Sequence, residues 1–144
     1  MQVPLQTQPF QFTAALSGAQ EVPPVVSAGS GLAHLGFDSR FTRLRVLLTI
    51  ANLRQVTAAH IHLGRPGQNG PIVLFLFGPS APADFLNPTV ITNATFTAAN
   101  LTGPLEGQPL SQLGRHIMEG NAYVNVHTVA WPNGEVRGQI GRRA

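Results

Sequence analysis

Two histidines in one apolar segment are the residues of this chain best placed to do chemistry. His60 and His62 are two positions apart. Because side chains alternate along a β-strand, these two share one face, while Ile61 and Leu63 share the other. The apolar pair belongs in the core, so we expect both imidazoles to point away from it, side by side. At that spacing two ring nitrogens can reach one metal ion.

A third histidine follows the same rule in a second apolar segment near the C-terminus. Val124 and Val126 are expected to point inward, which turns Asn125 and His127 outward. If the two segments are neighbouring strands of one sheet, His127 completes a three-imidazole cluster on the outer surface. The sequence permits this adjacency without requiring it.

A metal site built on these histidines would use nitrogen ligands alone, because the chain contains no cysteine. Imidazole binds copper, zinc, iron and nickel, and three neutral imidazoles with an open position suit a catalytic zinc ion or a copper ion. The competing interpretation is a set of surface histidines hydrogen-bonded to loops. Disulfides, iron–sulfur clusters and a cysteine nucleophile are excluded.

Charged residues elsewhere have a functional and an ordinary interpretation. Glu135 and Arg137 share a face of the expected last strand. There Glu135 would orient an imidazole and Arg137 would attract an anionic ligand, or both would simply face solvent. Glu21 precedes two prolines, and it either supports the site or anchors that rigid segment through an ion pair. Asn125 shares the face of His127 and is therefore a further candidate.

Other function classes find little support. No glycine-rich phosphate loop precedes a helix, and no Gly-x-Ser-x-Gly turn is present. The net charge is +3, the basic residues are all arginine, and they form no stripe interleaved with aromatic residues, so nucleic acid is not expected as a partner. No apolar run approaches the roughly 18 residues of a membrane span. The N-terminal residues lack the charged start and apolar stretch of a signal peptide.

The secondary-structure elements that position these candidate residues are expected to be short strands. The chain of 144 residues is sized for one domain, with 15 glycines and 12 prolines breaking it often. Alternating apolar patterns predict strands near 10–16, 32–38, 44–51, 56–63, 72–77, 90–97, 123–129 and 135–140. One helix is predicted near 109–119. This pattern is typical of an all-β, antiparallel Greek-key sandwich or barrel, spanning 10–141 after an N-terminal extension of residues 1–9.

Four motifs in sequence order resemble the CHRD domain family, which takes its name from chordin. They are Ser17–Pro24 with the sequence SGAQEVPP, Ala58–His62 with AAHIH, Tyr123–Thr128 with YVNVHT, and Gly134–Ile140 with GEVRGQI. The resemblance covers about residues 10–140. Members of the family often carry glycine directly after the second histidine, whereas here Leu63 precedes Gly64.

The resemblance implies a secreted, periplasmic or cell-surface β-sandwich, used in animal chordins within antagonists of growth factors. The order of motifs is also similar to that of copper–zinc superoxide dismutase, with a His-x-His strand, a later Val-His strand and a late arginine. Counterparts of that enzyme's bridging histidine and zinc-binding loop are not evident. We therefore expect copper rather than zinc as the metal.

Three functional hypotheses follow. The first is a copper-binding domain with His60, His62 and His127 as ligands and redox chemistry that involves superoxide. The second is a non-enzymatic adhesion or protein-interaction module, with an extracellular protein as partner and the histidines as structural groups. The third is a hydrolase that uses metal-bound water, which the shortage of nearby carboxylates disfavours.

Overall fold

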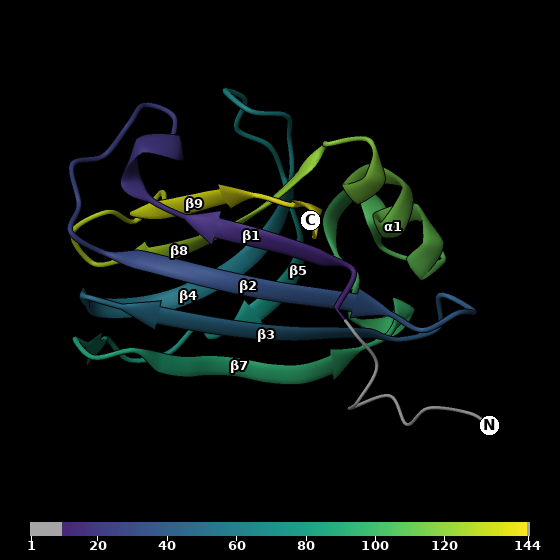
Figure 1. The fold of residues 1–144 in the computed structure, drawn as a ribbon, viewed down its shortest axis with the longest axis horizontal. Coiled ribbons are helices and arrows are strands. Elements are labelled where there is room, and N and C mark those ends of the chain that lie inside the picture. Colours follow the sequence, from purple (N-terminus) through teal and green to yellow (C-terminus); the bar gives the residue numbers. More distant parts are fainter. Residues whose placement is uncertain (1–9, 144) are drawn as a thin grey trace.

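Two antiparallel β-sheets, packed face to face, form the fold in the computed structural model, which describes residues 10–143 (Figure 1). The first sheet has the strand order β10-β1-β2-β3-β7. Its strands are β1 (Phe12–Leu16), β2 (Ser30–Phe37), β3 (Leu44–Ala51), β7 (Thr89–Phe96) and β10 (Gly141–Arg142). The all-β sandwich expected from the sequence is confirmed. The predicted extension 1–9 lies outside the described residues.

The second sheet has the order β5-β4-β8-β9, with the short strand β6 also paired to β4. Its strands are β4 (Leu53–Leu63), β5 (Ile72–Phe77), β6 (Ala83–Phe85), β8 (Ala122–Thr128) and β9 (Val136–Gln139). Strands β4 and β8 are antiparallel neighbours, with His60 opposite Asn125 and Ala58 opposite His127. The adjacency that the sequence left open is therefore present.

Alternation along the strands places the core between the sheets. In β3 every second residue from Leu44 to Ile50 is buried, as the sequence pattern predicted. Ala59 and Ile61 of β4 lie in the same core cluster as Val124 and Val126 of β8. The opposite faces of β4 and β8 are thereby turned away from the core, as expected.

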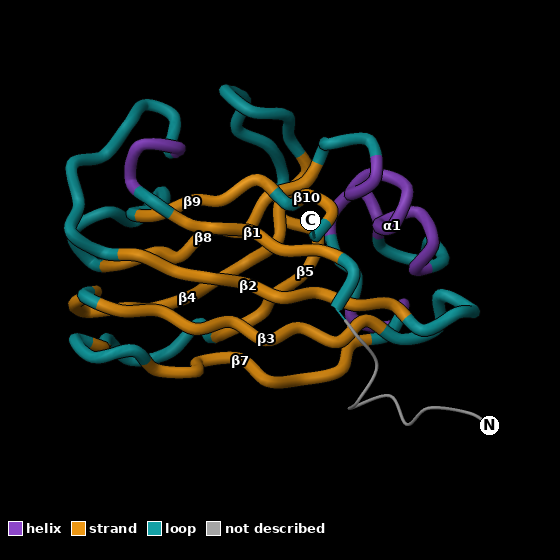
Figure 2. The backbone as a smooth tube through the Cα atoms, in the orientation of Figure 1, coloured by secondary structure: helices purple, strands orange, loops and turns teal. Residues whose placement is uncertain are grey.

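Helix α1 (Leu110–Met118) covers one end of the sandwich and leads into β8 (Figure 2). Its buried residues Leu110, Leu113 and Ile117 recur at helical spacing, which is why the sequence predicted this helix. The short 3-10 turns are η2 (Gly18–Gln20), η3 (Ala98–Asn100) and η4 (Gly103–Leu105). Among residues 10–143, no helix has the length and apolar character needed to cross a bilayer.

Strand β4 begins earlier than the sequence pattern indicated. The predicted strands 44–51 and 56–63 left residues 52–55 between them, but β4 starts at Leu53. Asn52 adopts a left-handed conformation with φ of 57°, so a single residue carries the chain from β3 in one sheet to β4 in the other. No strand was predicted between those near 72–77 and 90–97, but β6 lies there and pairs with Leu53 and Val56 of β4.

Candidate metal centre

His60, His62 and His127 form one cluster on the face of β4 and β8 that is turned away from the core. One ring nitrogen from each lies within 4.8 Å of one from each of the others. The ring centroids of His60 and His127 are 4.7 Å apart, and those of His60 and His62 are 5.6 Å apart. His60 and His62 are 6% and 7% exposed, so this cluster is largely buried, whereas the sequence indicated an outer surface.

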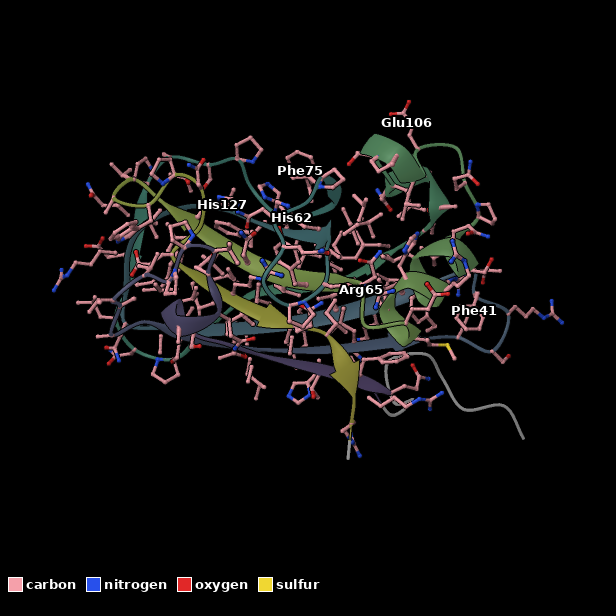
Figure 3. The ribbon with its side chains drawn as sticks, turned by 90° about the horizontal axis from the view of Figure 1, so that it is seen from above. Phe41, His62, Arg65, Phe75, Glu106 and His127 are labelled. Atoms are coloured by element: carbon pink, nitrogen blue, oxygen red, sulfur yellow. The ribbon has the colours of Figure 1, made fainter. Side chains whose placement is uncertain are left out.

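Loops around the cluster account for this burial. A cleft of about 830 Å³ opens above the histidines. Its walls come from the segment before β2, the β4–β5 loop and the β8–β9 turn, and the residues that line it are Val22, Pro23, Thr57, Ala58, His60, His62, Asn69, Gly70, Pro71, Ile72, Tyr123, Asn125, His127, Pro132 and Asn133. The histidines are the only ionisable side chains in this lining apart from Tyr123. Figure 3 shows His62 and His127 together with Phe75, well away from Phe41 beside α1.

Backbone carbonyl groups orient two of the three imidazoles. The Nδ1 atom of His62 lies 2.9 Å from the carbonyl oxygen of Gly70, and Nδ1 of His127 lies 2.9 Å from that of Pro132. A carbonyl oxygen only accepts, so each Nδ1 carries the proton and donates it. The Nε2 atom of each ring is then a free lone pair, which is the state a metal ligand requires.

His60 is oriented by rings rather than by a hydrogen bond. Its centroid lies 4.6 Å from that of Phe75, with the two planes nearly perpendicular at 80°. Its Nδ1 atom is buried and has no hydrogen-bond partner. Phe75 is 41% exposed, so this side chain covers His60 while part of it still meets solvent.

Three orphaned ring nitrogens make the cluster fit a metal ion. Nδ1 of His60, Nε2 of His62 and Nε2 of His127 are all buried without a hydrogen-bond partner. Leaving one such atom unpaired is costly, by about 1–3 kcal/mol. Three nitrogens on one ion, each at about 2.0–2.1 Å, lie about 3.3–3.6 Å apart in a tetrahedral or trigonal arrangement. Ring nitrogens at the 4.8 Å limit would have to approach one another by about 1.2–1.5 Å to bind one ion.

Burial keeps the imidazoles neutral. It lowers the pKa of His60 to about 4, with the neighbouring His127 and His62 adding to the effect. Burial also lowers the pKa of His62, although the hydrogen bond to Gly70 opposes it, and lowers that of His127 against the hydrogen bond to Pro132. Neutral rings at pH 7 compete for a metal without first losing a proton.

Glu21 and Asn125 lie buried beside the centre. They are 5% and 2% exposed. Burial raises the pKa of Glu21 to about 7, although Arg137 and a hydrogen bond with Asn125 oppose the rise. Gly134, with φ of 122°, allows this packing, because a Cβ there would lie 2.5 Å from Glu21 Oε2 and 2.7 Å from Asn125 Nδ2. The first glycine of the fourth sequence motif is thus required by close approach.

Arg137 is buried rather than solvent-facing, at 1% exposure. It lines a second hollow of about 390 Å³ together with Glu21 and with residues of the β4–β5 loop. Its Nη2 donates to the carbonyl oxygen of Arg65 at 2.9 Å and to Gln139 Oε1 at 3.3 Å. Its Cζ lies 3.5 Å from the ring centroid of Tyr123. The expected anion-attracting residue is therefore separated from His62 by this ring.

Glu135 contacts hydroxyl groups and not an imidazole. Its Oε2 accepts from Ser27 Oγ at 2.7 Å, and its Oε1 accepts from Thr128 Oγ1 at 2.8 Å. These bonds tie the end of β8 to the segment before β2. Orienting the imidazoles, the task considered for Glu135, is performed by the carbonyl groups described above.

Tyr123 and Gly70 are the residues that sequence reasoning missed. Tyr123 stacks on His62 with centroids 4.9 Å apart and planes at 5°. Alternation along β8 could have found it, because Tyr123 shares the face of Asn125 and His127. Gly70 is one of several loop glycines, and no signal in the sequence distinguished it.

Comparison with models of protein families shows which family the chain belongs to. The family model of the CHRD domain matches residues 12–140, a span that includes all three histidines. The chain belongs to the CHRD domain family. The predicted resemblance to this family is confirmed, with nearly the same boundaries. No curated protein and no solved structure matched the chain in these comparisons. The similarity of this CHRD domain to copper–zinc superoxide dismutase is not confirmed.

Proposed function

We propose that this CHRD domain binds one copper ion through His60 Nδ1, His62 Nε2 and His127 Nε2. The observation that carries the proposal is the convergence of three buried ring nitrogens that lack any other partner. Two of them are free because the opposite nitrogen is already committed to a backbone carbonyl. A coordinated ion would satisfy all three atoms at once.

The three imidazole nitrogen ligands favour copper over zinc. An all-imidazole set binds either ion, but divalent copper is held more tightly than zinc by a given nitrogen site. The lining of the cleft includes no carboxylate or thiolate that would favour another metal or act as the general base of a hydrolase. The order of sequence motifs, similar to that of copper–zinc superoxide dismutase, points the same way.

The domain's own residues would hold and expose the ion. Bound copper supplies one-electron chemistry at a position that small molecules, superoxide among them, reach through the cleft. His62 and His127 keep fixed ring orientations, and Phe75 shields His60 from one side. We further propose that the domain acts outside the cytoplasm, which the family resemblance suggests.

Titration of the metal-free protein with Cu(II), followed by calorimetry, tests the proposal. We expect one equivalent to bind with a dissociation constant in the micromolar range or below. His60→Ala should weaken binding at least tenfold, while His116→Ala is the matched control, because His116 lies on α1 and bonds Asn121. Absence of binding by the wild type, or equal binding by His60→Ala, would refute a three-histidine copper site.

A structural role for the histidines is the second candidate, favoured by one observation. The hydrogen bonds to Gly70 and Pro132 tie two loops to the sheet without any metal. In an adhesion or protein-interaction module of this kind, His127→Ala would lower the melting temperature of the metal-free protein, and adding copper would leave the wild-type melting temperature unchanged. Copper binding predicts a higher melting temperature for the loaded wild type.

A further inference from the structure

Tyr123 lies between a histidine of the proposed copper site and a buried cation. Its ring is parallel to that of His62, with 4.9 Å between centroids. The guanidinium of Arg137 covers the ring at 3.5 Å. His62 belongs to β4 and Arg137 to β9, the two neighbours of β8. The ring is therefore sandwiched between them, in an arrangement in which a cation over an aromatic face is attracted to it.

A second path joins Tyr123 to His62 through one glycine. The N–H of Gly70 donates to Tyr123 Oη at 3.1 Å, while the carbonyl of the same residue accepts from His62 Nδ1 at 2.9 Å. A Cβ at Gly70 would lie 1.6 Å from the carbonyl oxygen of Leu63, so only glycine fits here. Tyr123 thus fixes His62 both by its face and by its hydroxyl group.

Arg137 is held in place but is not part of the cleft. Its Nη2 bonds anchor the guanidinium, and its Nη1 is buried without a partner. Glu21 lines the second hollow together with Arg137. Because its pKa is about 7, the Glu21 carboxyl only partly neutralises the positive charge of Arg137 at pH 7. A ligand entering above the histidines would meet Tyr123 and not Arg137. The charge of Arg137 therefore acts on the proposed copper site across the Tyr123 ring and not through the cleft.

We propose that Arg137 and Tyr123 are positioning residues of the copper centre: Tyr123 fixes the His62 ring, and the charge of Arg137 favours Cu(I) over Cu(II). This inference rests on the proposed copper site. A fixed positive charge disfavours the more positive oxidation state. The guanidinium lies 3.5 Å from the Tyr123 centroid, which lies 4.9 Å from the His62 centroid, so the charge is about 8 Å from the His62 ring. At that separation and an effective dielectric of about 20, one unit charge changes such an equilibrium by about thirtyfold.

Redox titration of the copper-loaded protein tests the role of the charge. Arg137→Gln should lower the ratio of Cu(I) to Cu(II) affinity about thirtyfold, which is about 90 mV for a one-electron couple. Arg137→Lys should restore most of the potential, because the charge remains. Arg115→Gln is the control, since it removes an exposed arginine of α1 that pairs with Glu119. If Arg137→Gln does not fold, Arg137→Met removes the charge at similar volume.

Tyr123→Phe tests the positioning role separately. The variant keeps the stacked ring and loses the hydroxyl that accepts from Gly70. We expect Cu(II) affinity to fall severalfold and the absorption spectrum of bound Cu(II) to change. The ratio of Cu(I) to Cu(II) affinity should stay within twofold of the wild-type ratio. A wild type that binds no copper would overturn the proposed function. A wild type that binds copper, with an unchanged potential in Arg137→Gln and unchanged affinity in Tyr123→Phe, would overturn this inference alone.

Discussion

Replacing Glu21 by glutamine should change how the stability of the protein depends on pH. Glu21 is 5% exposed, and burial raises its pKa from 4.5 to about 7. The folded protein then holds a proton that the unfolded chain releases between about pH 4.5 and 7, so wild-type stability is lost as pH rises through this window. The difference in pKa corresponds to at most about 3 kcal/mol. Glutamine keeps the shape and an acceptor for Asn125 but carries no charge.

The free energy of unfolding, measured by urea denaturation of both metal-free proteins from pH 5 to pH 9, tests this. We expect similar stabilities at pH 5 and a variant up to about 3 kcal/mol more stable above pH 7. The three clustered histidines titrate in an overlapping range with the opposite sign, but they are common to both proteins and cancel in the difference. Glu119→Gln, on the exposed end of α1, should show no such trend. A difference in the free energy of unfolding between wild type and Glu21→Gln that stays constant from pH 5 to pH 9 would refute the interpretation that Glu21 is buried with a raised pKa.

Three further outcomes follow from the same geometry. Gly70→Ala should destabilise the protein by at least about 2 kcal/mol and weaken Cu(II) binding, because its Cβ would lie 1.6 Å from a backbone carbonyl oxygen. Gly134→Ala should lower the melting temperature by several degrees, whereas Gly141→Ala, with nothing within 4 Å of its Cβ, should not. Cu(II) affinity should fall little between pH 7 and pH 6, because burial lowers the pKa of all three histidines. Three ordinary imidazoles of pKa about 6.5 would lose about thirtyfold, and calorimetry at both pH values distinguishes the two cases.

Much of the fold could be predicted from the sequence, because alternation is a local property. Strands β3 and β5 have the predicted bounds, and helix α1 is one residue shorter at each end. The reversal at Asn52 was missed, because a single left-handed residue joins two strands of different sheets and no turn motif marks it. Likewise β6 is only three residues long and depends on pairing with β4.

The candidate site was predicted in part. Alternation alone predicted the strand face on which His60, His62 and His127 lie. That the three rings lie close together depends on the pairing of β4 with β8, which the structure shows. The burial of Arg137 could not be predicted, because it results from the β4–β5 loop, which places the carbonyl of Arg65 against the guanidinium. The hydrogen bond from Ser27 to Glu135 likewise joins residues 108 positions apart, and local patterns do not encode it.

Electron paramagnetic resonance of untagged protein with one equivalent of Cu(II) tests the copper centre most directly. We predict a single type of site whose spectrum reports imidazole nitrogen ligands, and a loss of nitrogen coupling in each of His60→Ala, His62→Ala and His127→Ala. A spectrum dominated by oxygen ligands, or one that stays the same in all three variants, would refute coordination of copper by these histidines.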